Sequence, residues 1–132
     1  MNNDAFEESL QAIGRAIVET TGGNGEGAFL YAEAKPGMMS PSLFVDRGSY
    51  VECLMTSEAL SEALFDSWEA SEEGKEWAAL RYTIDEGKFD ARFQYPDELS
   101  EEEWIDDRRN RILSEKYGDR PIKYPPPPET AM

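Results

Sequence analysis

Apolar side chains near the start of the chain recur at intervals of four, three and four residues, the stripe of an amphipathic helix. They are Phe6, Leu10, Ile13 and Ile17. Asp4 and Glu7 have the spacing of an N-cap residue and its reciprocal partner, so we expect a helix from Asp4 to about Thr20. The segment TTGGNGEG follows it without a preceding strand or a following Lys-Ser/Thr pair. It therefore predicts a helix end and a flexible connector, not a phosphate-binding loop.

Three short runs rich in aromatic and β-branched residues come next and predict antiparallel strands. They are AFLYAEAK at 28–35, SLFVDRG at 42–48 and SYVECLM at 49–55, separated by the turn-forming segments PGMMSP and Arg47-Gly48. Cys53, the single cysteine of the sequence, lies in the third run and has no disulfide partner within the chain. We expect it to be a reduced, buried thiol.

A second set of apolar residues at helical spacing follows these strands. Leu60, Ala63, Leu64 and Trp68 fall on one face. Thr56 or Ser57 is expected to cap the start of this helix, and Gly74 is expected to end it.

The segment 77–95, WAALRYTIDEGKFDARFQY, has the clearest alternation in the chain. Its apolar positions are Leu80, Tyr82, Ile84, Phe89, Ala91, Phe93 and Tyr95. Polar residues lie between them, which predicts a hairpin with one buried and one solvated face and with DEGK as its turn. Pro96 is expected to end the second strand.

The segment 100–118, SEEEWIDDRRNRILSEKYG, predicts a third helix that begins at Ser100, has Ser100 and Glu103 in capping-box spacing, and stops at Gly118. The predicted order is therefore α-β-β-β-α-β-β-α. It gives an α+β domain over residues 1–120, with an antiparallel sheet of about five strands and three helices.

The remaining residues, 121–132, form a Pro-rich tail. Its four consecutive prolines favour an extended polyproline II conformation. We expect the tail to pack along the domain through Ile122 and Tyr124, with binding to an aromatic-lined groove as the alternative.

The composition of the chain argues against several classes of function. The chain has 28 Asp and Glu against 13 Lys and Arg, a net charge of −15 at pH 7, and no His. The charge argues against direct nucleic-acid binding, because phosphate neutralisation needs clustered Lys and Arg. The absence of His excludes His-dependent nucleophiles, an imidazole base and the usual zinc ligand sets. We therefore expect a binding protein with no catalytic, metal or cofactor residues, and basic or neutral partners.

No segment approaches the ~20 apolar residues of a membrane span, and the start of the sequence lacks the basic and apolar regions of a signal peptide. These features predict a soluble, cytoplasmic protein that does not bind a membrane.

The segment DELSEEEWIDDRRNR at 97–111 places seven acids before three arginines. Acids stabilise a helix start and basic residues a helix end, so a solvated helix terminus explains part of the pattern. However, like charges at i, i+4, as in Glu102 with Asp106, each cost roughly 0.2–0.5 kcal/mol of helix stability. A surface for a basic partner therefore stays open beside the solvated helix start. Its candidate residues are Asp97, Glu98, Glu101, Glu102, Trp104, Asp106 and Asp107.

Trp104 has the same two interpretations. It is either a core residue that packs with Ile112 and Tyr117, or the aromatic centre of a contact patch surrounded by carboxylates.

The stretch from Trp77 to Gly118 resembles the YezG-like immunity proteins of bacterial polymorphic toxin systems. The residues that carry the resemblance are KEW at 75–77, DEGKF at 85–89, YPDEL at 95–99, Arg108, Arg109 and EKYG at 115–118, with LYAEA at 30–34 similar to the first strand of that family. Leu113 stands where the family has Trp. The resemblance implies a cytoplasmic antitoxin that binds and neutralises a cognate secreted toxin, with a nuclease as the expected class, and it brings no catalytic residues.

A second class shares the same element order and acidity. Acidic chaperones of type III secretion bind an unfolded effector segment and usually dimerise through an apolar helix. Such a dimer needs a second apolar face on the helix that carries Leu60, Leu64 and Trp68, where Phe65 is the available residue.

Overall fold

The computed structural model describes residues 3–22, 25–71, 73–99 and 102–124. These residues form an α+β fold of three α-helices and a six-stranded, mostly antiparallel sheet in the order α-β-β-β-α-β-β-α-β, so the predicted fold class is confirmed. The elements are α1 (Asn3–Thr21), β1 (Ala28–Lys35), β2 (Met38–Asp46), β3 (Val51–Leu54), α2 (Glu58–Glu69), β4 (Ala79–Asp85), β5 (Lys88–Gln94), the 3-10 helix η1 (Pro96–Glu98), α3 (Ile105–Tyr117) and β6 (Ile122–Lys123). None of the described helices is long and apolar enough to cross a membrane.

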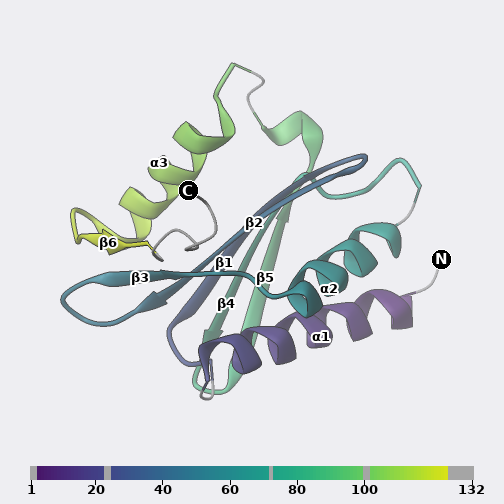
Figure 1. Ribbon diagram of the computed structural model, residues 1–132. Helices are drawn as coiled ribbons and strands as arrows, with labels where there is room; N and C mark the ends of the chain where they lie inside the picture. Colours follow the sequence, from purple (N-terminus) through teal and green to yellow (C-terminus); the bar gives the residue numbers. More distant parts are fainter. Residues whose placement is uncertain (1–2, 23–24, 72, 100–101, 125–132) are drawn as a thin grey trace, which may run out of the picture.

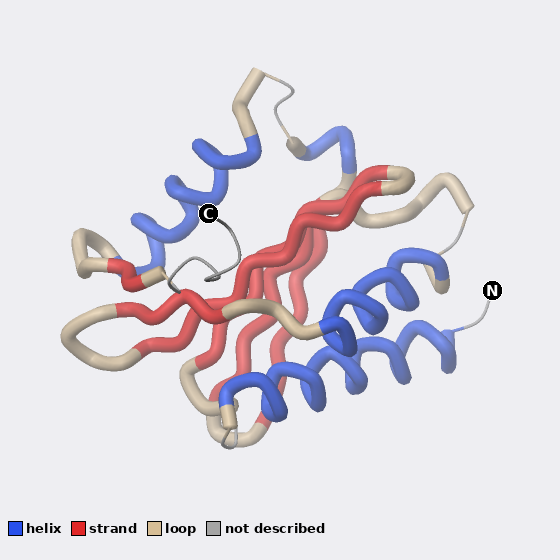
Figure 2. Tube along the Cα trace, in the orientation of Figure 1, coloured by secondary structure: helices blue, strands red, loops and turns tan. Residues whose placement is uncertain are grey.

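The sheet has the strand order β5-β4-β1-β2-β3-β6. All neighbours pair antiparallel except β3 and β6, which are parallel. Figure 1 shows α1 and α2 side by side on one face of the sheet and α3 on the opposite face. The same three layers are visible in Figure 2, with the strands between the two groups of helices.

Strand β1 lies inside the sheet and is covered on both faces, which explains its nearly continuous apolar sequence. Its alternate residues belong to two separate cores. Leu30 packs with α1, α2 and β4, whereas Phe29 and Tyr31 pack with Ile112 and Tyr117 of α3. This double coverage fixes α3, the helix that contains the end of the acidic segment 97–111, against the sheet.

The helices differ from the predicted bounds at their ends. Helix α1 already includes Asn3, so Asp4 lies inside the helix and the prediction that it is the N-cap is wrong. The N-cap of α2 is Ser57, whose Oγ accepts a hydrogen bond from the backbone N–H of Leu60 at 3.1 Å. That helix ends at Glu69 and not at Gly74, because the cap residue Ala70 closes it with an N–H bond to the carbonyl of Asp66.

The predicted turn PGMMSP is shorter than expected, because β2 begins at Met38 and leaves Pro36-Gly37 as the turn. Pro41 therefore lies in a strand, opposite Ala32 of β1. Proline is tolerated there because β3 pairs with β2 only over residues 43–46, so Pro41 lies where β2 has a free edge.

The start of the third helix was predicted wrongly. Helix α3 begins at Ile105 with Trp104 as its N-cap, and residues 100–101, including the expected cap Ser100, lie outside the described residues. Pro96 instead starts η1, where a Glu98 carboxylate oxygen accepts from the backbone N–H of Tyr95 at 2.7 Å. Since Glu102 precedes α3, it forms no i, i+4 helical pair with Asp106, and the same holds for Glu103 with Asp107.

The sixth strand was not predicted. Ile122 and Lys123 of the expected tail pair in parallel with Val51 and Glu52 of β3. Residues 125–132, which contain the four consecutive prolines, lie outside the described residues.

Candidate partner-binding groove

A groove of about 870 Å³ lies at one end of the sheet. Its walls come from the β1–β2 hairpin, the segment between α2 and β4, η1 and the start of α3. All three tryptophans of the sequence, Trp68, Trp77 and Trp104, line it together with apolar residues that include Met38 and Leu99. Segments that are far apart in the sequence thus form one concave surface that contains three tryptophans together with other apolar and charged residues. We call it the tryptophan groove.

Two of these tryptophans belong to the fixed side of the groove. The indole N–H of Trp68 donates to the carbonyl of Trp77 at 3.0 Å, and the ring of Trp77 packs against Phe93 at a centroid distance of 6.0 Å. Trp77 is buried, and its own indole N–H has no hydrogen-bond partner among the described residues. These contacts fix both indole rings, and the unpaired N–H of Trp77 is buried and not open to a ligand.

Trp104 differs from the other two because 77% of its surface is exposed. Its prediction as a core residue is wrong: Ile112 and Tyr117 pack with Phe29 and Tyr31 in the core beneath α3, without it. The reason is its position as the N-cap of α3, before the first helical turn and beyond the sheet. A large aromatic side chain therefore stands in solvent at the edge of the tryptophan groove.

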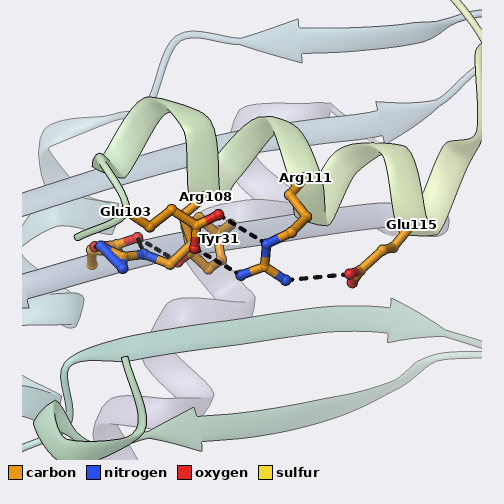
Figure 3. A network of polar contacts seen from close by, with 6 residues as sticks. Tyr31, Glu103, Arg108, Arg111 and Glu115 are labelled. Carbon is orange, nitrogen blue, oxygen red and sulfur yellow. Dashed lines mark hydrogen bonds and ion pairs between the residues drawn. The ribbon is translucent and has the colours of Figure 1, made fainter. Parts of the chain in front are cut away.

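A buried ion pair lies on the α3 side of the groove. Glu33 and Arg108, exposed by 4% and 7%, form two hydrogen bonds: Nε to Oε2 at 2.8 Å and Nη2 to Oε1 at 3.2 Å. The phenol of Tyr31 also donates to Glu33 Oε2, and burial, followed by this carboxylate, raises the pKa of Tyr31. Figure 3 labels Tyr31 and Arg108, the two residues that donate to Glu33, within this network. This network attaches the first turns of α3 to β1.

A second arginine of α3 holds the segment before the helix. Arg111 donates to both carboxylate oxygens of Glu103 at 3.0 Å and to Glu115 at 3.3 Å, as Figure 3 shows. The hydrogen bond from Arg111 lowers the pKa of Glu103. Because Glu103 is adjacent to Trp104, these exposed contacts position the tryptophan at the groove.

The predicted acidic residues lie around this wall of the groove. Asp97 and Glu98 are exposed on η1, Glu102 is exposed before α3, and Asp106 and Asp107 are exposed in its first turn. Glu101 lies outside the described residues. Of the six predicted residues that the structure describes, Trp104 is the one that lines the groove itself, while Glu103, which was not predicted, lines it beside Trp104.

Glu98, Asp106 and Glu102 have interactions within the protein. Glu98 caps the N–H of Tyr95, and Asp106 accepts from Arg109 Nη2 at 3.2 Å. Asp97 and Asp107 make no ion pair with any described residue. They are therefore the acids that are most available to an external cation.

Sequence reasoning missed Glu33, Tyr31 and the two distant tryptophans. Glu33 did give a signal, since it is the one acid in the apolar run AFLYAEAK, and a buried acid requires a cationic partner. Its partner lies 75 residues further along the chain, at a separation that periodicity does not reveal.

Two other places in the structure, Cys53 and the pair Glu26 and Asp85, are weaker candidates for a functional site. Burial raises the pKa of the half-buried Cys53 thiol, which makes it a weaker nucleophile. The carboxyl groups of Glu26 and Asp85 are neighbours at the β4–β5 turn. Backbone N–H donation from Glu86 lowers the pKa of Glu26, whereas the hydrogen bond to Glu26 raises the pKa of Asp85. No group of three or more potential metal ligands occurs in the described ranges.

The chain was compared with known proteins. No protein-family model matches it, and no curated protein sequence matches it either. The comparisons therefore assign no function, and a proposal must draw on the sequence motifs, the tryptophan groove and the charge around it.

Proposed function

We propose that this protein is a cytoplasmic immunity protein that binds and neutralises a basic toxin domain. The proposal rests on the resemblance of residues 77–118 to YezG-like immunity proteins and on the tryptophan groove. The observation that carries it is Trp104, whose side chain is 77% exposed at a concave surface with unpaired acids nearby. Exposed aromatic residues in concave, partly apolar surfaces are typical centres of binding energy.

The partner that fits is a folded basic protein with an apolar side chain flanked by Lys or Arg. Met38, Leu99 and the tryptophans would receive the apolar side chain, and Asp97 and Asp107 would face the basic residues. A nuclease toxin meets this description, because a nucleic-acid-binding surface is basic. The net charge of −15 would accelerate its association with such a surface.

The chaperone alternative requires an exposed apolar face on α2 for dimerisation, and α2 offers little of one. The apolar face of α2, with Leu60, Ala63 and Leu64, is buried. Phe65 is the one large apolar residue of α2 that is exposed, at 37%. A single partly exposed side chain is a small surface for dimerisation through this helix.

The first test uses Trp104→Ala. Co-expression of the protein with the basic domain encoded beside its gene should rescue growth and yield a complex of two folded proteins. Trp104→Ala should weaken the complex roughly tenfold or more, because truncating a central aromatic residue removes binding energy that other contacts do not replace. Calorimetric titration measures the dissociation constant.

Met55→Ala is the matched control, because Met55 is 65% exposed and does not line the groove. It should bind like the wild type. If hydrogen exchange shows that the partner remains unfolded in the complex, the protein belongs to the chaperone class. Equal affinities for Trp104→Ala and Met55→Ala would show that the groove is not part of the interface.

The second test concerns the acids and replaces the unpaired Asp97 and Asp107 by Asn. The association rate with the basic domain should fall at low salt and approach the wild-type rate at high salt, because the Debye length shrinks from about 10 Å at 0.1 M to about 3 Å at 1 M. Stopped-flow fluorescence measures the rate. The control removes two exposed acids of α2, Glu62→Gln with Glu69→Gln. If the association rate falls equally in both double variants, the cause is the change in net charge and not the position of Asp97 and Asp107.

A further inference from the structure

Strand β5 ends the sheet and pairs with β4 alone in the described part of the chain. Its register follows from the two-residue turn Glu86-Gly87, in which both residues have positive φ (53° and 76°). Such a turn makes Asp85 and Lys88 a hydrogen-bonded pair. Since hydrogen-bonded pairs alternate along an antiparallel ladder, Phe89, Ala91 and Phe93 direct their backbone N–H and C=O groups away from β4. Seven residues of β5 thus form an unpaired edge.

The side chains of β5 are chemically symmetric about Ala91. Phe89 and Phe93 lie two positions to either side of it, and Asp90 and Arg92 lie one position to either side. We propose that a second copy of this chain pairs antiparallel with β5, centred on Ala91, and joins the two sheets across a twofold axis. In this register Phe89 of each copy faces Phe93 of the other, and Asp90 of each faces Arg92 of the other.

The charges select this register over its neighbours. A shift of two residues in one direction would place Asp90 opposite Asp90 of the second copy and Lys88 opposite Arg92. A shift in the other direction would place Arg92 opposite Arg92. Like charges directly opposite each other destabilise a strand pair, whereas opposite charges and aromatic pairs stabilise it. Of these three registers, the one centred on Ala91 has complementary charges.

Both charged residues are accessible. Their side chains, exposed by 62% for Asp90 and 79% for Arg92, now bond to each other within one strand at 2.9 Å. Pairing exchanges this contact in each of the two copies for two equivalent contacts between copies. The apolar part of the edge is uncovered as well, because Phe89 is 44% exposed although its ring stacks on Tyr82 at 5.0 Å. Strand β5 carries a net charge of +1, whereas the whole chain carries −15. Two copies of this edge can therefore approach without the repulsion that acidic surfaces would cause.

The test uses charge reversal and complementation in the full chain. Analytical ultracentrifugation of the wild type should show a concentration-dependent dimer. Asp90→Arg alone places Arg opposite Arg at both positions, and Arg92→Asp alone places Asp opposite Asp, so each should weaken dimerisation roughly tenfold or more. An equimolar mixture of the two variants should recover the dimer as a heterodimer, because every cross-strand pair is then complementary.

Recovery in the mixture would show that both variants fold and that the contact is between these two positions. Glu62→Arg on α2, which makes the same change in net charge as Asp90→Arg, is the control and should leave the dimer intact. A monomeric wild type at all concentrations, dimeric single variants, or no recovery on mixing would each overturn the proposal. A monomer whose Asp90→Arg variant loses toxin binding would assign this edge to the toxin instead.

Discussion

Replacing Arg108 by Met should lower the free energy of unfolding by about 3–5 kcal/mol, because it leaves the carboxylate of Glu33 buried without its cationic partner. Glu33 is 4% exposed, and its remaining partner is the phenol of Tyr31. A single neutral donor does not replace the guanidinium that now bonds to both carboxylate oxygens. Urea unfolding followed by circular dichroism measures the loss.

The matched control is Arg111→Met, one helical turn along α3. Arg111 also bonds to both oxygens of a carboxylate, that of Glu103, but its side chain is 49% exposed. Exposed ion pairs add little to stability because solvent screens them, so Arg111→Met should have little effect on unfolding. Combining Arg108→Met with Glu33→Leu should recover most of the stability, because a buried ion pair can be exchanged for apolar packing. Equal losses for the two arginine variants would contradict this account.

Replacing Gly14 by Ala should destabilise the protein by about 2–4 kcal/mol, although Ala is the better helix former by about 1 kcal/mol. A Cβ atom at Gly14 would lie 2.7 Å from the phenol oxygen of Tyr82. The phenol O–H of Tyr82 donates to the carbonyl oxygen of Leu10 at 2.7 Å, and burial raises the pKa of Tyr82. The added methyl group must displace the phenol and break this bond.

Tyr82→Phe removes the conflicting atom and provides the control. The nearest remaining ring atom is 3.7 Å from the added Cβ, an ordinary van der Waals contact. In the Tyr82→Phe background, Gly14→Ala should therefore be stabilising. Denaturant unfolding of the four proteins gives the coupling free energy of this double-mutant cycle. The same sign in both backgrounds would show that the phenol does not restrict position 14.

Much of the fold could be predicted because the apolar patterns of β1, β4 and β5 and of α1 and α2 are local. The start of α3 could not, since it depends on competition between distant groups. Glu103 was expected to cap its own helix, but Arg111 holds its carboxylate, and Glu98 caps η1 instead. The parallel strand β6 was missed because two residues carry no periodicity and their partner lies about 70 residues earlier.

The candidate site was predicted in part. The acidic residues were recognised as exposed, and exposure of Trp104 was one of two open interpretations. The groove could not be predicted, since it requires Met38 of a hairpin and Trp77 of a loop to meet at one end of the sheet.

The position of β1 affects how the chain folds during synthesis. It is the first strand to be made, yet its neighbour β4 follows only after α2, and α3, which covers its second face, emerges later still. Helix α1, which covers one face of β1, is already made, but until α3 emerges the face that carries Phe29 and Tyr31 lacks its native cover, a condition that favours aggregation. Correct folding therefore depends on events late in translation, and a ribosome that stalls before α3 releases a chain that is prone to misassembly.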